Sequence, residues 1–336
     1  MEIGVLMNSE PGRTAQTAQM VETLGLDRVA LPDSQNLTPD VWGQLMLAAG
    51  ATTRIRLGPG VTNSVTRDPA VTASAALGLQ LASGGRAILG IGRGDSSVQR
   101  IGKREDPVAS FERYLVRLQG YLRGESVDRD GFASRLEWLE RVKAPKVPVE
   151  VAATGRRVIE IAARHADAIC FAVGADEAHL RDVLDHARAT AREAGRDPGA
   201  VRYGAFINCV INDDLAVARN GVRGSTATFA RFSALRGSRL EALPPPLRTA
   251  AGFLRDHYDM REHTRTGVQH SAGLSDEFVD WFGIAGPVAR ALPRFRRLAE
   301  VGLDFCVVIP GSTGMPRDVA AASLLSLAND IAPALR

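Results

Sequence analysis

The segment Arg54–Ser97 reads RIRLGPGVTNSVTRDPAVTASAALGLQLASGGRAILGIGRGDSS and contains one complete β–α–β unit. Two nearly continuous apolar runs, 54–62 and 86–94, flank a stretch of helical periodicity over Ala70–Leu81. Runs that are apolar at almost every position are typical of parallel strands covered on both faces. The two glycines and the proline of Gly58-Pro59-Gly60 weaken the first strand, so we expect either a bulge or a tight loop at this point.

The same alternation of strand and helix runs through the whole chain. Further strands are predicted at 2–8, 28–33, 147–153, 168–173, 201–211 and 304–311, and further helices at Thr14–Leu24, Pro39–Ala49, Val108–Leu122, Arg156–His165, Asp176–Ala194 and Met315–Asn329. Eight strands that alternate with helices form either a closed barrel or an open doubly wound sheet. Because the count is eight and no linker divides the chain, we predict an α/β fold, a (β/α)8 TIM barrel, with residues 1–336 as one domain.

Two intervals between predicted strands are too long for one helix and its loops. They place insertions after the fourth and seventh strands, at about 95–146 and 212–285. We expect helical insertions, and we expect the second to lie over the mouth of the barrel.

The composition excludes several classes of protein. Among 336 residues, 41 Lys and Arg balance 38 Asp and Glu, and a net charge of +3 does not indicate binding to nucleic acid or an anionic membrane. No signal peptide pattern and no membrane-spanning apolar run is present, which favours a cytoplasmic protein. Cys170, Cys209 and Cys306 lie in apolar runs and predict buried, reduced thiols; we expect no metal site.

Polar residues and glycines gather where the predicted strands end, and TIM barrels carry their active sites at these ends. Asp33 and Ser34 follow the second strand. Asp33 suits a helix cap or turn as well as a polar group beside a bound ring, and the residue type alone favours neither. Ser34 is more often a turn former than a catalyst.

The fourth strand ends in Gly90-Ile91-Gly92-Arg93-Gly94-Asp95. The pattern is a poor dinucleotide fingerprint, because the third glycine comes too soon and no acid-tipped second strand follows. It predicts a stretch of backbone with few side chains, which a planar ring can approach closely. Asp95 is then a candidate proton donor or substrate contact, or alternatively a cap.

Thr154, Gly155, Arg156 and Arg157 precede a predicted helix. Free N–H groups, the helix dipole and two arginines at this point favour a phosphate site over a plain cap. His257, His263 and His270 have spacings that suit neither one helix face nor a zinc site, so we expect them at the surface.

The string GPGVTN…TRDPAVTASA…SGGRA…GIGRGD, within Arg54–Ser97, closely resembles the luciferase-like monooxygenase superfamily. Within it, the match is best to the branch that uses coenzyme F420, typified by methylenetetrahydromethanopterin reductase. The resemblance implies a TIM barrel, often dimeric, that acts on a small-molecule substrate, with a non-proline cis peptide at Gly60–Val61 behind the deazaflavin ring.

The resemblance also assigns site residues. It implies that Asp33 and Ser34 face the ring, that Asn63 follows the bulge and that Asp95 holds the acidic position. It further implies that the backbone of Arg93 and Gly94 contacts the ring. Thr154, Gly155, Arg156 and Arg157 match the loop that binds the phosphate of the cofactor tail.

One departure from the family bears on the chemistry. Several dehydrogenase relatives carry Asp-His at the end of the second strand, where the histidine takes a proton from an alcohol, but this chain has Ser34 there. We therefore expect hydride transfer from reduced F420 to a C=C or C=N bond, with Asp95 and Asp33 as candidates to manage the proton. The alternatives are an FMN-dependent monooxygenase that uses reduced flavin and oxygen, and a non-catalytic flavin-binding barrel.

Overall fold

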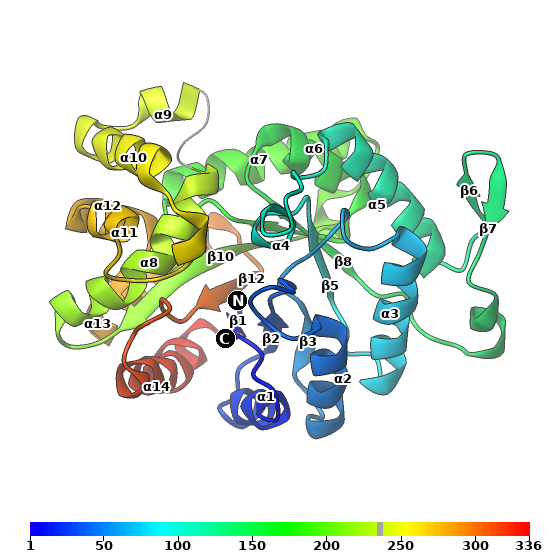
Figure 1. Ribbon diagram of the computed structural model, residues 1–336, viewed down its shortest axis with the longest axis horizontal. Coiled ribbons are helices and arrows are strands. Elements are labelled where there is room, and N and C mark those ends of the chain that lie inside the picture. The colour runs from blue at the N-terminus through cyan, green and yellow to red at the C-terminus, as the bar shows by residue number, and fades with distance from the viewer. Residues whose placement is uncertain (234–237) are drawn as a thin grey trace.

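A parallel barrel forms the body of the protein (Figure 1), whose computed structural model describes residues 1–233 and 238–336. The strands of the barrel are β1 (Glu2–Leu6), β2 (Arg28–Leu31), β3 (Arg56–Pro59), β4 (Thr62–Asn63), β5 (Leu89–Gly92), β8 (Val149–Ala153), β9 (Ala168–Phe171), β10 (Arg202–Ile211) and β12 (Phe305–Ile309). They are hydrogen-bonded in the order β3-β2-β1-β12-β10-β9-β8-β5-β4, and every pairing along this path is parallel. A further parallel bridge, Leu57 to Ala87, joins the first strand of the path to the chain entering β5. The predicted TIM barrel is confirmed.

The predicted third strand is divided in two. The chain leaves β3 at Pro59, passes through a cis peptide between Gly60 and Val61, and resumes as β4. Both the bulge and the cis bond lie where the sequence and the family resemblance placed them. The bulge turns the backbone at Val61 towards the C-terminal end of the barrel, where the cavity described below is found.

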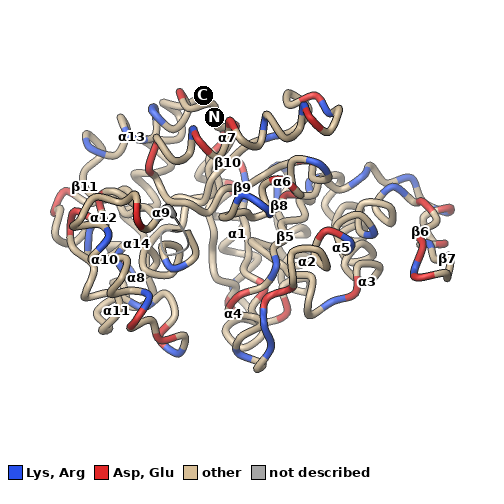
Figure 2. The backbone as a smooth tube through the Cα atoms, turned by 90° about the horizontal axis from the view of Figure 1, so that it is seen from above, with Lys and Arg blue, Asp and Glu red and all other residues tan. Residues whose placement is uncertain are grey.

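Helices surround the barrel (Figures 1 and 2). They are α1 (Thr14–Thr23), α2 (Val41–Ala51), α3 (Pro69–Ala82), α5 (Val108–Leu122), α6 (Arg156–His165), α7 (Glu177–Glu193), α13 (Val288–Val301) and α14 (Arg317–Ser326), with short turns η2 (Pro198–Ala200), η4 (Leu327–Ile331) and η5 (Pro333–Leu335). The sequence placed the start of α2 at residue 39, two residues early, because the Asp40 side chain accepts a hydrogen bond from the Gly43 N–H and is the N-cap. None of the described helices is both long and apolar enough to cross a membrane.

The first insertion is not helical throughout, which corrects the expectation for residues 95–146. Beside α4 (Ser96–Gln99) and the barrel helix α5, it contains an antiparallel hairpin of β6 (Val127–Arg129) and β7 (Phe132–Ser134), followed by η1 (Glu137–Arg141). The hairpin turns at Asp130 and Gly131, which have φ of 58° and 95°. The Asp-Gly dipeptide favours the left-handed turn that joins two short strands, so it is a local indication of a hairpin. Figure 2 shows the hairpin projecting from the body.

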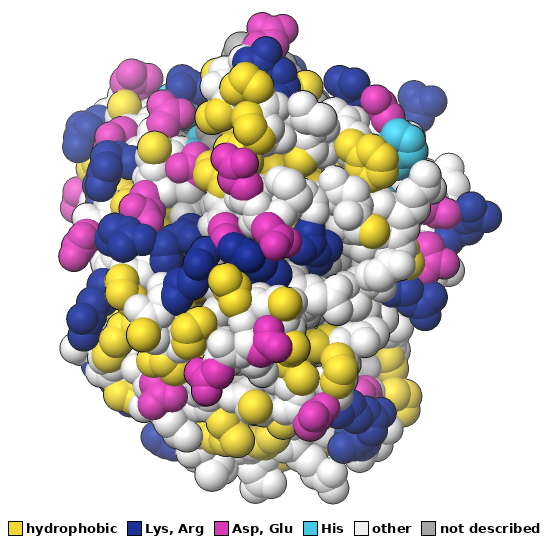
Figure 3. Space-filling model, turned by 90° about the vertical axis from the view of Figure 1, so that its left-hand side faces the viewer, with side chains coloured by type: hydrophobic (Ala, Val, Ile, Leu, Met, Phe, Trp, Pro, Cys, Tyr) yellow, Lys and Arg dark blue, Asp and Glu magenta, His cyan; other side chains and the backbone are white. Residues whose placement is uncertain are grey.

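The second insertion is mostly helical, as predicted. It contains α8 (Leu215–Ser233), α9 (Ser238–Ala242), α10 (Pro245–His257), η3 (Met260–Glu262), α11 (Gln269–Ala272) and α12 (Asp276–Phe282), and β11 (Ile284–Gly286) then pairs with β10. The insertion has an apolar core of its own. Arg219 and Arg223 of α8 pair with Asp276 of α12. Figure 3 shows charged side chains of both signs intermingled on this side of the molecule.

All three cysteines are buried and unpaired, as predicted. Burial raises the pKa of Cys170, and it raises those of Cys209 and Cys306 to about 12. They are therefore inert thiols of the barrel wall.

Gly58→Ala tests the packing that closes the barrel. A Cβ at Gly58 would lie 1.8 Å from the backbone oxygen of Ile88, so the two strands would have to separate. We expect a loss of about 3 kcal/mol in the free energy of unfolding, measured by urea denaturation. As a control, Gly252→Ala in α10 meets no atom within 4 Å and should stabilise by roughly 0.5–1 kcal/mol. An unchanged stability for Gly58→Ala would contradict this account.

Candidate active site

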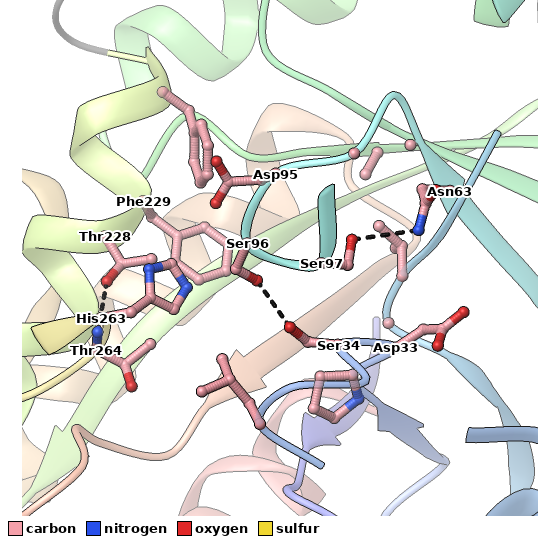
Figure 4. A pocket seen from close by; sticks show the side chains of 18 of the residues that line it. Asp33, Ser34, Asn63, Asp95, Ser96, Ser97, Thr228, Phe229, His263 and Thr264 are labelled. Atoms are coloured by element: carbon pink, nitrogen blue, oxygen red, sulfur yellow. Dashed lines mark hydrogen bonds between the residues drawn. The ribbon is translucent and has the colours of Figure 1, made fainter. Parts of the chain in front are cut away.

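A cavity of about 560 Å3 opens at the C-terminal ends of the strands. The barrel supplies one side, which includes Asp33, Ser34, Gly60, Val61, Asn63, Arg93, Gly94, Asp95 and Thr154. The second insertion supplies the other side, which includes Thr228, Phe229, Phe232, His263, Thr264 and Arg265. Figure 4 shows Asp33, Ser34 and Asn63 on one side of the space and Thr228, Phe229, His263 and Thr264 on the other, with Asp95 close to Phe229. Nine of the twelve predicted site residues therefore lie together.

The remaining three predicted residues lie beside the cavity rather than in its lining. Gly155, Arg156 and Arg157 begin α6 directly after Thr154, and all three are exposed. No side chain caps this helix, so its first N–H groups remain available to an anion. Arg156 makes a long contact of 3.3 Å to Asp182. The arrangement suits a phosphate at the rim of the cavity.

Asp33 is buried at the end of β2. Its Oδ2 accepts a hydrogen bond of 2.7 Å from the Thr62 hydroxyl, which comes from β4 just beyond the bulge. Burial raises the pKa of this carboxyl above its ordinary value, and the Thr62 hydrogen bond opposes the rise. Asp33 thus has a partner in the barrel, and its position places it against the bulge.

Ser34 and Asn63 hold the short helix α4 across the cavity. The Ser34 hydroxyl lies 3.2 Å from the Ser96 hydroxyl, and the Asn63 amide donates to the Ser97 hydroxyl at 3.2 Å (Figure 4). Asn63 Oδ1 also accepts from the backbone N–H of Val65 at 2.9 Å. These contacts connect the C-terminal ends of β2 and β4 to α4, which follows β5. They set the width of the cavity at this point.

Arg93 and Gly94 present backbone rather than side chains to the cavity floor. The Arg93 guanidinium turns away and donates from Nε to the Asp106 carbonyl at 2.5 Å. Gly94 has a φ of 96°, and a Cβ on it would meet Val98 Cγ2 at 2.3 Å. A larger residue would displace α4, so glycine is required here by both conformation and space.

Asp95 forms an ion pair with Arg231 of α8. Burial raises the pKa of the Asp95 carboxyl, and Arg231 counteracts this rise. Arg231 also packs over the Tyr258 ring, with 4.6 Å from the guanidinium carbon to the ring centroid. Asp95, which follows the glycine-rich end of β5, therefore links the barrel to the second insertion.

His263 and Tyr258 are cavity-side residues that the sequence did not identify. His263 lines the cavity and His270 is buried, so their predicted surface location is wrong, whereas His257 is exposed as expected. The three histidines do not share one helix, because His263 follows a 3-10 turn and His270 belongs to α11. No local signal marks His263, because its position depends on how the insertion folds back over the barrel.

The floor of the cavity suits a flat ring. Gly92, Ala152 and Ala172 line it beside Val61, and a Cβ added at Gly92 would lie 3.4 Å from Val61 Cγ2. Larger side chains here would fill the space in which a planar group can lie. Together with the uncapped start of α6, this floor fits a flavin or deazaflavin with a phosphate-bearing tail. The described residues hold no cluster of metal-ligating side chains.

A TIM barrel with a bare floor, a bulged third strand and an anion-binding helix start defines a class of enzymes that bind a planar redox cofactor. The chain matches the family model described as luciferase-like monooxygenase over residues 3–304, and it belongs to this family. The family resemblance seen in the sequence is confirmed, and the chain is an oxidoreductase.

One relative is similar to this chain in sequence over nearly its whole length, and two solved structures share its fold. A 5,10-methylenetetrahydromethanopterin reductase of Methanolobus tindarius is 28% identical over 319 residues, covering 93% of this chain and 94% of the relative. The coenzyme F420-dependent tetrahydromethanopterin reductase of Methanopyrus kandleri superposes with a TM-score of 0.76 at 21% identity, covering 100% of this chain and 99% of that one. An F420-dependent secondary alcohol dehydrogenase in complex with an F420–acetone adduct also has a TM-score of 0.76, at 18% identity, with coverage of 100% and 99%.

Asp33→Asn should change how stability depends on pH. The raised pKa of Asp33 means that the folded state binds the proton more tightly than the unfolded chain. Stability is therefore lost as pH rises from the unfolded value, about 4, through the folded one. Because asparagine does not ionise and still accepts from Thr62, the variant should gain roughly 1 kcal/mol over the wild type above this window.

Thermal unfolding of both proteins from acidic to neutral pH measures this difference. The advantage of Asp33→Asn should grow with pH and then level off. Asp256→Asn is the control, because Arg255 lowers the pKa of the exposed Asp256 and the difference should be zero or of opposite sign. An advantage for Asp33→Asn that is constant at every pH would contradict the assignment.

Arg231→Met should leave Asp95 buried without its cation. We expect a further rise in the Asp95 pKa and a loss of about 2 kcal/mol at neutral pH, because only a fifth of each side chain is exposed to solvent. Adding Asp95→Asn should restore part of the loss. The control is Arg255→Met, which breaks the exposed Arg255–Asp256 pair and should have no measurable effect on urea denaturation. Equal effects of the two arginine changes would refute the coupling.

Proposed function

We propose that this enzyme transfers hydride from reduced coenzyme F420 to a small molecule with an activated C=C or C=N bond. The observation that supports it most is the bare floor of Gly92, Ala152 and Ala172 beside the Gly60–Val61 bulge, next to an uncapped helix start. The named F420-dependent relatives support the choice of a deazaflavin. When bound, a reduced deazaflavin supplies a hydride from its C5.

The residues of this chain would bind and orient the ring. The backbone of Arg93 and Gly94 and the side chain of Val61 would contact its faces, with Asp33, Ser34 and Asn63 at its edge. Thr154, Gly155, Arg156 and Arg157 would hold the tail phosphate, through N–H groups and positive charge. Asp95, held by Arg231, would keep a charged group at the rim, where a proton must enter to complete the reduction.

Ser34 favours reduction over the oxidation of alcohols. Its hydroxyl lies against the Ser96 hydroxyl, and a serine hydroxyl is too weak a base to take a proton from an alcohol at neutral pH. A reduction needs no base at this position. We therefore propose reduction of a C=C or C=N bond rather than oxidation of an alcohol.

Binding of oxidised F420, reduced F420 and FMN to the purified protein tests the proposal. We expect F420 to bind at micromolar or lower concentration and FMN to bind more weakly. Binding of FMN without binding of F420 would overturn it. The second candidate, an FMN-dependent monooxygenase, has the support of the family description, and it predicts oxygen uptake with reduced FMN.

Changing Arg156 and Arg157 together to Ala should weaken F420 binding about tenfold, because both lie at the start of α6 where the phosphate would sit. Deazariboflavin, which has the ring but no phosphate, should bind the wild type and the double variant equally. Fluorescence titration measures both ligands. Arg164→Ala, at the other end of the same helix, is the matched control and should leave both affinities unchanged. A loss of affinity for both ligands would mean that the arginines do not act on the phosphate.

We also propose a homodimer in the cytoplasm. Helices α2 and α3 lie side by side (Figure 1) and expose Met46, Leu47, Val71 and Leu81, although each helix packs its other face on the barrel. Four apolar side chains exposed on adjacent helices are typical of a surface that a second copy covers. The three buried, unpaired cysteines fit a reducing compartment.

Leu47→Glu should disrupt this dimer, because a carboxylate would then be buried in an apolar interface. Leu47 is 54% exposed in the single chain, so the substitution itself should not unfold the protein. Light scattering coupled to size-exclusion chromatography should give half the wild-type mass. Val217→Glu, at an exposed position of α8, should leave the mass unchanged. A monomeric wild type would refute the proposal.

A further inference from the structure

On the insertion side, the cavity contains a histidine side chain to which the proposed reduction assigns no role. His263 projects into the space from the segment that follows η3, opposite Asp33, Ser34 and Asn63 on the barrel side (Figure 4). A substrate that lies over the floor of the barrel would therefore have His263 on its other side. Phe229, from α8, lies beside the imidazole and supplies apolar contact.

The orientation of the imidazole is fixed by Tyr258. The Tyr258 hydroxyl lies 2.6 Å from His263 Nδ1 and 3.1 Å from the Thr228 hydroxyl. Thr228 Oγ1 in turn accepts from the backbone N–H of Thr264, the residue after the histidine, at 3.1 Å. The imidazole is thus positioned by Tyr258, and Thr228 of α8 binds both Tyr258 and the backbone next to His263. No described residue forms a hydrogen bond with Nε2.

The hydrogen bonds around His263 are compatible with either neutral tautomer, and the donor strengths of the two groups favour one of them. An unprotonated imidazole nitrogen is a strong acceptor and a phenol is a strong donor, whereas a phenol oxygen is a weak acceptor for an imidazole N–H. We therefore take Tyr258 to donate to Nδ1 at 2.6 Å and to accept from the Thr228 hydroxyl, which also lies 3.2 Å from the Gly224 carbonyl. In a neutral ring the proton then resides on Nε2, which is the atom directed at the cavity.

The surroundings keep both groups in these forms. Burial, together with Arg231 and Arg100, lowers the pKa of His263 to about 3, so the imidazole stays neutral. Burial raises the pKa of Tyr258 to about 12, so the phenol keeps its proton to donate. The same two arginines add positive potential on the side of the cavity where His263 lies.

We propose that the Nε2–H of His263 donates a hydrogen bond to the substrate, whose reacting double bond must then contain or be conjugated to an acceptor atom. This inference rests on the proposed reduction and specifies its substrate class as imines and α,β-unsaturated carbonyl compounds. On addition of a hydride to the substrate carbon, the π electron pair would move to the imine nitrogen or the carbonyl oxygen, the atom to which His263 would donate. The hydrogen bond stabilises that charge, and a proton from solvent water completes the product.

The tautomer can be measured without cofactor or substrate. Nitrogen-15 NMR of the full-length protein labelled at histidine, with His263→Gln to assign the signal, should show a neutral ring protonated on Nε2. Tyr258→Phe should remove this preference, since Nδ1 then lacks its donor. A ring protonated on Nδ1, or on both nitrogens at neutral pH, overturns the proposal.

Two probes of similar shape test recognition of the acceptor. On titration of the wild type, 2-cyclohexenone should shift the His263 Nε2–H signal, and cyclohexene, which has no acceptor, should not. His263→Leu should weaken enone binding about fivefold, and His263→Gln, whose amide N–H can reach the same position, should retain most of it. His257→Gln, at an exposed histidine of α10, should behave as the wild type.

An enone that shifts no His263 signal, or that binds His263→Leu as well as the wild type, also overturns the proposal. These outcomes are separate from those that test the proposed function. Failure of F420 to bind would refute the deazaflavin reaction and leave the tautomer and the enone shifts to be judged on their own. F420 binding together with an Nδ1-protonated ring would refute only the role of His263.

Discussion

Direct contact of backbone with backbone at the closure of the barrel is the constraint on which the rest of the structure depends. Gly58 of β3 lies against the Ile88 carbonyl, and Gly90 of β5 lies so close to the Pro59 carbonyl that a Cβ would approach it to 2.2 Å. Side chains at these positions would hold the strands apart. Directly after Pro59 the chain passes through the bulge at Gly60–Val61, and both of these residues line the cavity. The contacts that close the barrel and the bulge beside the cavity floor are therefore adjacent.

The barrel and the second insertion form the cavity together, and each has its own kind of packing. The barrel strands have their backbone groups satisfied within the sheet, which leaves their C-terminal ends rigid and close together. The second insertion has its own apolar core, which includes Val210 of β10, and Phe229 of α8 packs on Phe206 of β10; polar contacts add to this apolar packing. Arg231 pairs with Asp95, and Arg100 donates to the Met260 carbonyl at 2.6 Å. Differences in substrate among such enzymes can arise in the insertion while the floor stays the same.

The strands could be predicted because parallel strands buried on both faces require nearly continuous apolar runs, and few other structures do. The bulge could be predicted because proline and glycine are unusual within a strand. The hairpin at Asp130–Gly131 was missed because its strands have only three residues each and show no clear alternation. His263 was missed for a different reason. Its partner Tyr258 is in turn bound by Thr228, which lies thirty residues before Tyr258 in sequence, and no local pattern links the three residues.

By itself, the sequence determined the architecture, the position of the bulge and the strand ends at which polar residues meet. These features depend on local periodicity, on glycine and proline, and on the rule that parallel strands end at one side of a barrel. Tertiary structure alone decided that Asp95 is paired with Arg231 and that His263 lies in the cavity with one nitrogen held and the other directed at the substrate space. Both depend on the path of a long insertion back across the barrel, and contacts made over such separations leave no period in the sequence.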